Sequence, residues 1–199
     1  MSSADSPVPG FGCMRLGPVV RTRDMCGLLY SAFVGIGLAT FDAFATPYVL
    51  GVGIGLPIEQ QGAVVGRLNV YTEIILLIVF TPFGVLSDRI GRRAVYAFGF
   101  CCLAGGYSLF PYAESVTELA LARVLYSLGL GAVTGMIATL LGDYAIPAHR
   151  GRIVGLTGVV NGLGIVCSAI FLARLPSVFV ERGYDAFTAG QYTLFIVSG

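Results

Sequence analysis

Long stretches without a charged side chain constrain this chain more than any other feature of its sequence. Residues 94–113, 124–142 and 153–173 contain no Asp, Glu, Lys or Arg, and each approaches or exceeds the ~20 residues that a helix needs to cross a bilayer. Because lipid offers the backbone no hydrogen bonds, such stretches cross as helices. With 56% hydrophobic and 12% charged residues among 199, the composition indicates an all-α polytopic membrane protein.

We expect five complete helices and the start of a sixth. The five helices are expected at residues 25–46, 64–86, 94–112, 117–141 and 153–173. The sixth begins near Thr188. Pro47 is expected to end the first helix, with a glycine-rich link after it, and Pro57 to start an interfacial turn of helix.

The predicted helices divide the chain into two parts. Residues 1–24 form a cytoplasmic amino-terminal tail, and residues 25–199 form a transmembrane bundle truncated in its sixth helix. We expect the chain to be a fragment and not a half-length chain that dimerises, because an incomplete helix leaves carbonyl groups without partners in hydrocarbon. Two glycine pairs predict close helix contacts inside the bundle. They are Gly131 with Gly135, and Gly158 with Gly162.

A short charged turn separates the second and third helices. Residues 84–93 read Gly-Val-Leu-Ser-Asp-Arg-Ile-Gly-Arg-Arg, so the two helices form a hairpin with this turn in water. Short cytoplasmic loops hold an excess of Lys and Arg. This turn, the tail and the 143–152 loop hold eight of the twelve basic residues. The amino terminus is therefore expected in the cytoplasm, with the protein multi-pass in the plasma membrane, as in a bacterial inner membrane.

The turn resembles the signature loop of the major facilitator superfamily of transporters, which reads G-x-L-x-D-R-x-G-R-R between the second and third helices. The resemblance implies a cytoplasmic charge network in which Asp88 and the arginines help hold one state of an alternating-access cycle. An ordinary polar turn would explain the arginines through topology, but not the glycines or Asp88. The residues assigned to this gating network are Gly84, Asp88, Arg89, Gly91, Arg92, Arg93, Asp143 and Arg150.

The last two come from the loop after the fourth helix, whose D-x-x-x-P-x-x-R-G arrangement also resembles the family. Asp143 is expected to pair with Arg92 or Arg93. Arg150 is expected to pair with Asp88. The simpler interpretation is a solvated turn in which the proline ends the helix. Pairs at the edge of water contribute about 0–1 kcal/mol each, which suits a latch that opens in every cycle.

An arginine near the start of the fourth helix needs a partner. This part of the helix resembles the family pattern R-x-x-Q-G-x-G, in which the arginine lies near the substrate cavity, although Tyr126 and Ser127 replace the Gln and the first Gly. An unpaired arginine in hydrocarbon is unfavourable by about 3 kcal/mol on the mildest scale. We therefore expect Arg123 to approach one or both of two acids at comparable depth, Asp42 and Glu73.

This cluster has two interpretations. A carboxylate that exchanges a proton for contact with Arg123 would couple transport to H⁺, whereas a structural ion pair would keep both acids ionised. Asn161, midway through the fifth helix, is assigned to the same coupling and substrate cavity. Alternatively, its amide only hydrogen-bonds to a neighbouring helix.

Other classes of function are disfavoured by what the sequence lacks. The net charge is +1 and no basic stripe is interleaved with aromatic residues, so we expect no nucleic-acid partner. The five cysteines include no C-x-x-C pair, and the single histidine lies in a loop, so we expect no metal and no cofactor. No arrangement of nucleophile and base indicates an enzyme.

The resemblance implies the amino-terminal half of a secondary active transporter that moves a small organic solute by alternating access. H⁺ is the expected coupling ion, and the partners are the lipid bilayer and the carboxy-terminal half of the same transporter. A multidrug efflux antiporter is the alternative within transport, although the fifth helix lacks the G-P pair of such antiporters. A membrane scaffold or sensor with this fold is the alternative from another class, but it would need no network that opens.

Overall fold

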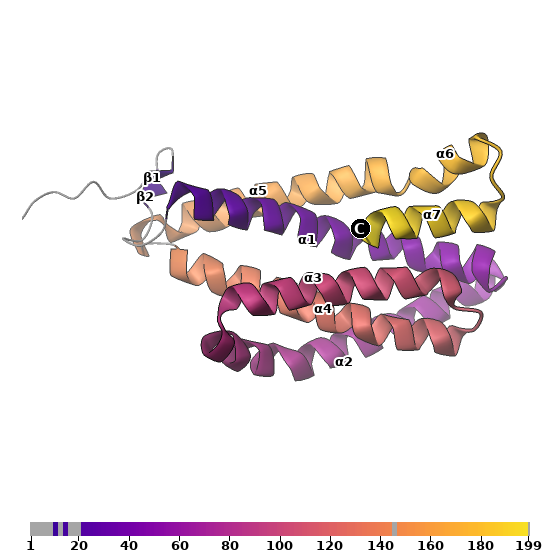
Figure 1. Cartoon of the computed structure of the whole chain (residues 1–199), viewed down its shortest axis with the longest axis horizontal. Helices are drawn as coiled ribbons and strands as arrows, with labels where there is room; N and C mark the ends of the chain where they lie inside the picture. Colours follow the sequence, from indigo (N-terminus) through magenta and orange to yellow (C-terminus); the bar gives the residue numbers. More distant parts are fainter. Residues whose placement is uncertain (1–9, 12–13, 16–20, 145–146, 199) are drawn as a thin grey trace, which may run out of the picture.

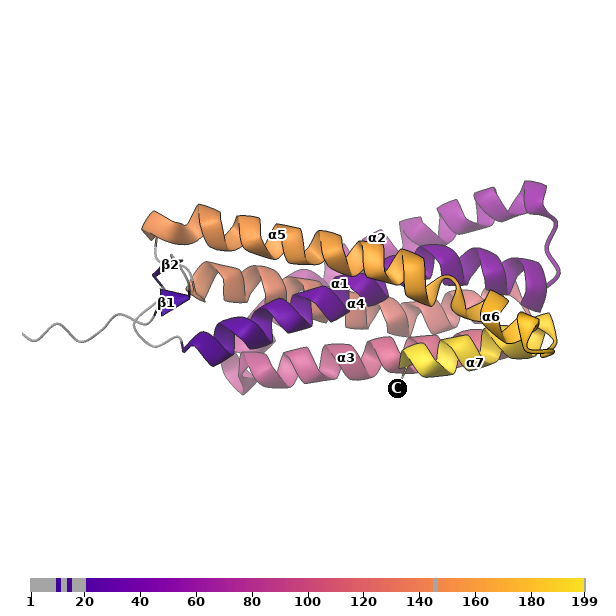
Figure 2. The same cartoon turned by 90° about the horizontal axis from the view of Figure 1, so that it is seen from above.

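Helices make up nearly all of the computed structural model, which describes residues 10–11, 14–15, 21–144 and 147–198. Figures 1 and 2 show them running along one long axis. They are α1 (Thr22–Tyr48), α2 (Ile58–Ile90), α3 (Arg92–Leu109), α4 (Val116–Tyr144), α5 (Arg150–Cys167), α6 (Leu175–Glu181) and α7 (Ala186–Ser198). Ahead of α1, two short strands pair in antiparallel fashion, β1 (Gly10–Phe11) and β2 (Met14–Arg15).

Short helical turns extend or link these helices. Two are π-helical, η1 (Val49–Gly53) after α1 and η4 (Ser168–Leu172) after α5, and two are 3₁₀ turns, η2 (Phe110–Tyr112) and η3 (Pro147–His149). In the described part of the chain, five segments are long and apolar enough to cross a membrane. They are Thr22–Gly53, Ile58–Ile90, Arg92–Tyr112, Val116–Tyr144 and Arg150–Glu181. The predicted all-α polytopic bundle with five membrane-crossing helices is therefore confirmed, and α7 lies where the further helix is expected.

The prediction that Pro47 ends the first helix is wrong. α1 continues through Pro47 to Tyr48 and then into η1. A proline removes one backbone donor, but a membrane helix that stopped there would leave several groups unpaired, and a local π adjustment satisfies them instead. The expected glycine-rich link is consequently reduced to residues 54–57. Pro57 directly precedes the continuous helix α2, so no separate interfacial helix forms.

The loops group at two ends of the bundle. Figure 1 shows that the start of α1 lies at the same end as the turn between α2 and α3 and the link between α4 and α5. We call this the amino-terminal end; the α3–α4 and α6–α7 links lie at the opposite end. Both arginine-bearing loops thus share one side with the start of α1. Which side faces the cytoplasm stays a prediction.

Glycines let α3 and α4 touch through their backbones. A Cβ added at Gly129 would lie 2.6 Å from the carbonyl oxygen of Gly99, and one added at Gly106 would lie 2.8 Å from the Cα of Tyr126. Lipid provides no hydrophobic drive for helix association, so such close packing supplies much of it. α5 approaches α1 in the same way, because a Cβ at Gly164 would lie 2.5 Å from the carbonyl oxygen of Phe33.

The two glycine pairs predicted from the sequence differ in outcome. A Cβ added at Gly131 would lie 2.7 Å from Val79 of α2, so this glycine does serve helix packing. Around Gly158 and Gly162 nothing lies within 4 Å of an added Cβ. The second pair therefore makes no close contact in the described part of the chain, because it lies on an open face of α5.

The helices differ in how much of their surface the bundle covers. In the most apolar window of each span, 39% of the residues are buried in α1 and 44% in both α3 and α4, but only 11% in α2 and in the α5 span. Large apolar side chains stand exposed along both, including Leu77 of α2 (78%) and Val159 of α5 (63%). α2 and α5 thus present uncovered apolar faces.

Candidate functional site

Arg123 of α4 lies at the centre of a buried polar network. Its side chain donates four hydrogen bonds: from Nε to Thr72 Oγ1 (3.1 Å), from Nη1 to Thr46 Oγ1 (2.7 Å), and from Nη2 to Asp42 Oδ2 (2.6 Å) and Asn69 Oδ1 (2.7 Å). The residue is only 3% exposed. The guanidinium thereby gains a carboxylate and three neutral acceptors, as a buried charge requires.

Helical spacing brings these acceptors together. Asp42 and Thr46 are four residues apart on α1, while Asn69 and Thr72 are three apart on α2, so each pair shares one face of its helix. Arg123 follows the start of α4 by about two turns, or about 10 Å. The network therefore joins three helices near the opposite end of the bundle.

The acceptors are themselves hydrogen-bonded. Thr46 Oγ1 donates to Asp42 Oδ1 (2.9 Å), and Thr72 Oγ1 donates to the carbonyl of Leu68 (3.2 Å). Ser127, which is fully buried, contacts Thr72 through their hydroxyls (3.2 Å). Each oxygen of Asp42 thus accepts a hydrogen bond, and buried polar groups of this kind rigidify a site when their partners are complete.

Two tyrosines support the network from α3 and α4. The ring of Tyr126 lies under the guanidinium, with 5.9 Å from Arg123 Cζ to the ring centroid, which is within cation–π range. Its hydroxyl donates to the carbonyl of Ala39 (3.1 Å), and the hydroxyl of Tyr107 donates to the carbonyl of Leu38. Both bonds fix α1 one turn before Asp42.

Glu73 does not join this network. Within the described residues, no hydrogen bond or ion pair connects it to Arg123, and its side chain is exposed. The physical reason is helical periodicity: Glu73 follows Thr72 directly, so it points about 100° away around α2. Of the two acids expected near Arg123, only Asp42 makes contact.

Sequence reasoning did not identify Thr46, Asn69 or Thr72 as acceptors for the arginine. The sequence does contain a signal for these residues. Thr46 lies four residues after Asp42, and Asn69 and Thr72 lie three residues apart, so the members of each pair share one face of a helix. Hydroxyl and amide acceptors are common in helices, so only the packing of α1 against α2 and α4 distinguishes these from others.

The expected charge network at the amino-terminal end is formed in part. Arg92, at the start of α3, makes an ion pair with Asp143, near the end of α4. Asp88 and Arg150 are both exposed, and no ion pair joins them in the part of the chain that the structure describes. The expected Asp88–Arg150 pair is therefore absent from this conformation.

The glycines and remaining arginines of the turn differ in role. Gly91 has φ of 91°, a backbone conformation that favours glycine, and it separates α2 from α3. Gly84 has open space where a Cβ would stand, so packing within the described residues does not require it. Arg89 and Arg93 are exposed.

Asn161 of α5 is half-buried. Its amide oxygen is shielded from solvent and has no hydrogen-bond partner within the described residues. The simpler interpretation, a hydrogen bond to a neighbouring helix, is not realised by this atom.

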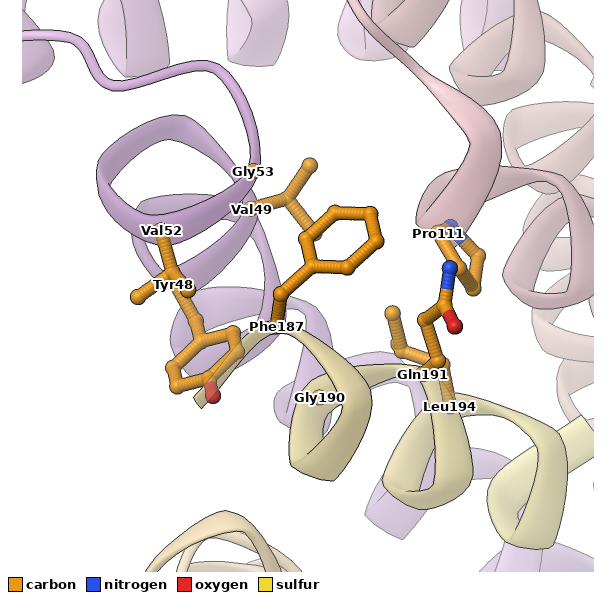
Figure 3. Close-up of a pocket in the computed structure, with 9 residues that line it drawn as sticks. All are labelled: Tyr48, Val49, Val52, Gly53, Pro111, Phe187, Gly190, Gln191 and Leu194. Atoms are coloured by element: carbon orange, nitrogen blue, oxygen red, sulfur yellow. The ribbon is translucent and has the colours of Figure 1, made fainter. Parts of the chain in front are cut away.

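A small cavity lies at the opposite end, between η1, η2 and α7. Figure 3 shows Phe187 between Val49 and Pro111, with the ring of Tyr48 beside Gly190. The cavity has a volume of about 20 Å³, which holds a water molecule but no organic solute. It is a gap in the packing, not a substrate site.

The fold agrees with a comparison of this sequence with models of known protein families. Residues 27–180 match the family model described as Major Facilitator Superfamily. The chain belongs to the major facilitator superfamily.

Relatives of this superfamily member bear several names. The magnetosome protein MamH of Paramagnetospirillum magneticum is 30% identical over 79% of this chain and 38% of its own length. A probable 4-methylmuconolactone transporter of Cupriavidus pinatubonensis is 28% identical over 84% of the chain and 40% of its own length. Multidrug resistance protein 3 of Bacillus subtilis is 28% identical over 65% of the chain and 21% of its own length. The chain thus spans at most two fifths of each of these three relatives.

Proposed function

We propose that this chain is the amino-terminal half of a secondary active transporter that moves a small organic solute across the plasma membrane by alternating access. Membership of the superfamily and relatives named as transporters support a role in transport over one in catalysis. The proposal goes further in assigning proton coupling to the network around Arg123. The observation that carries it is the set of partners that this arginine has.

Arg123 retains acceptors when Asp42 is protonated. Its contacts with Thr46, Thr72 and Asn69 do not depend on the charge of Asp42. A purely structural ion pair needs its carboxylate, because breaking it leaves a buried charge without a partner. Here three neutral oxygens can hold the guanidinium while the carboxyl carries a proton. This arrangement supports a role for Asp42 as the coupling acid.

Glu73 supports a second, water-facing part of the pathway. It lies close to the middle of α2, a helix of 33 residues, and its side chain is exposed. Ionisable residues at the centre of a membrane face a protein interior or a water-filled cavity, because exposure to lipid is unfavourable. We therefore assign this face of α2 to the pathway between this chain and a carboxy-terminal half. Asn161, with its unpaired amide oxygen, belongs to the same proposed cavity.

The gating network forms the other part of the proposal. Gly84, Asp88, Arg89, Gly91, Arg92, Arg93, Asp143 and Arg150 would hold one state of the cycle. The Arg92–Asp143 pair lies half-exposed, with 32% and 45% of the side chains accessible. Exposed pairs contribute about 0–1 kcal/mol, so such a contact can break and reform. Asp88, which is exposed here, is available for a partner in another state.

Transport of a panel of organic solutes by the protein as the cell makes it, in vesicles at several external pH values, tests the proposal. Asp42→Asn should leave the amount of folded protein nearly unchanged and abolish the pH dependence of transport. Glu73→Gln should alter the same pH dependence. Asp185→Asn, an exposed acid at the opposite end, is the matched control and should change neither property.

Two outcomes would contradict proton coupling. Unaltered pH dependence in both acid variants would favour uniport. Loss of folded protein in Asp42→Asn would mark the pair as structural.

Two further outcomes would favour the alternative functions. Transport mainly of chemically unrelated cationic drugs would favour the multidrug efflux alternative, which one relative's name supports. Absence of transport of any solute would favour the scaffold or sensor.

A further inference from the structure

A large cavity in the described structure shares two of its lining residues, Arg92 and Arg93, with the proposed gating network. It has a volume of about 760 Å³ and lies at the amino-terminal end between the first turns of α1 and α3 and the last turns of α4. This volume falls within the range of ligand-binding pockets, about 300–1,000 Å³.

Positive charge gathers at its mouth. Four arginines line the cavity, Arg21 and Arg23 around the start of α1 and Arg92 and Arg93 at the start of α3. Asp24 is the only acidic residue among the described residues of the lining, and its carboxylate accepts a hydrogen bond from the backbone N–H of Arg21 (2.9 Å).

Most of this charge lacks a neutralising partner. Asp143 pairs with Arg92 from outside the lining. In the described part of the chain, no ion pair joins a carboxylate to Arg21, Arg23 or Arg93. Four guanidinium groups therefore face two carboxylates, and the cavity mouth is suited to an anion.

The floor of the cavity is mostly apolar, and the hydroxyl of Ser31 at this depth donates to the carbonyl of Gly27 on its own helix (2.7 Å). Leu28 of α1 and Phe100 of α3 line the floor, each seven residues beyond an arginine of the mouth (Arg21 and Arg93), which is about 10 Å along a helix. Leu140 of α4 closes the same side. The cavity thus changes from charged to apolar in the direction that leads from the membrane surface into the hydrocarbon.

We propose that this cavity binds an anionic phospholipid of the adjacent leaflet. The phosphate lies among the four arginines, and the start of an acyl chain covers the floor. Basic pockets between membrane helices bind anionic headgroups in this way. A free phosphate would use the mouth and leave the floor empty. The inference does not depend on the proposed transport function or on which leaflet faces the cytoplasm.

Lipid retention tests the inference on the protein as the cell makes it, purified from vesicles of phosphatidylcholine mixed with phosphatidylglycerol. Mass spectrometry of the intact protein counts the retained lipids, and titration gives their affinity. We expect preferential retention of phosphatidylglycerol. Arg23→Gln and Arg93→Gln should each weaken it about fivefold, since a basic residue near the membrane surface contributes about 1 kcal/mol.

Arg152→Gln is the matched control. Arg152 is exposed at the same end but does not line the cavity, so its loss should leave the affinity unchanged. Because Arg23 and Arg93 are also exposed, all three variants should unfold at the same temperature. Equal weakening by the control, or equal retention of phosphatidylcholine, would overturn the proposal. Displacement of the lipid by millimolar inorganic phosphate would identify the site as one for a free anion and would overturn it too.

Discussion

At the scale of single residues, Arg123 shows how one charge organises the polar side chains of three helices. Each of its bonds goes to a different side chain, and each of those belongs to α1 or α2. Removing a neutral acceptor should therefore destabilise the protein without touching the ion pair. Thr72 is the best position for this test, because its hydroxyl links Arg123 to Ser127.

Thr72→Val should lower the free energy of unfolding by about 1–3 kcal/mol, because it leaves a buried charged donor with one acceptor fewer. Thermal unfolding in detergent measures the effect. Thr40→Val is the matched control, since the hydroxyl of Thr40 bonds only to the carbonyl of Ile36 on its own helix. Equal shifts for the two variants would show that Thr72 contributes nothing beyond its local hydrogen bond.

At the scale of elements, the glycines of α3 and α4 set how closely these helices approach. Gly129 packs against Gly99 and Leu103, and a Cβ there would lie 2.5 Å from the backbone nitrogen of Leu103. The side chain would meet backbone atoms, which cannot move aside without separating the helices. α5 shows the contrast, because its Gly158 faces open space.

Gly129→Ala should therefore destabilise the bundle by about 1–3 kcal/mol or more, as overpacking does. Gly158→Ala should be neutral or stabilise it by up to about 1 kcal/mol, because alanine favours helix more than glycine. Unfolding temperatures of the two variants decide the matter. If Gly129→Ala unfolds at the temperature of the unmodified protein, the α3–α4 contact is looser than described.

The turn between α2 and α3 belongs to the proposed gating network. Asp88→Asn should slow transport several-fold while membrane insertion and unfolding temperature stay unchanged, since Asp88 is exposed and unpaired in the described structure. Solute flux in vesicles is the measurement, and Asp185→Asn, at an exposed acid of the opposite end, is a control of equal charge. A flux equal to that of the unmodified protein would reduce the loop to a determinant of topology.

At the scale of the whole molecule, the arrangement of loops makes orientation testable. Ala148 lies at the amino-terminal end and Ser177 near the opposite end, and both are exposed. In a variant whose native cysteines are replaced by serine, an impermeant maleimide added outside cells should label Ser177→Cys. Ala148→Cys should react only after the membrane is permeabilised. Labelling of Ala148→Cys in intact cells would reverse the proposed orientation.

The uncovered faces of α2 and α5 also belong to this scale. Only 11% of the residues are buried in the most apolar window of either span, so lipid or a second half must cover them. The exposed carboxylate of Glu73 at mid-helix argues that water or protein, and not lipid, covers that part of α2.

The sequence by itself determined the number of membrane-crossing helices. Uncharged runs such as residues 94–113 must cross as helices, because lipid leaves the backbone no other way to satisfy its hydrogen bonds. The same argument required a partner for Arg123, and Asp42 was among the two acids named in advance. Both inferences rest on the cost of leaving a backbone group or a charged side chain without a partner in lipid, which does not depend on how the helices pack.

Only the tertiary structure decided which candidates meet. Asp42 contacts Arg123 and Glu73 does not. The face of α2 that packs against α4 holds Thr72, and Glu73 lies about 100° around the helix from Thr72. Gly131 serves packing and Gly158 does not for the same reason. Pro47 stays inside a helix because the membrane makes a break less favourable than a π turn. The position of a residue along a membrane helix gives its depth in the membrane. Whether its side chain faces a neighbouring helix depends on how the helices pack.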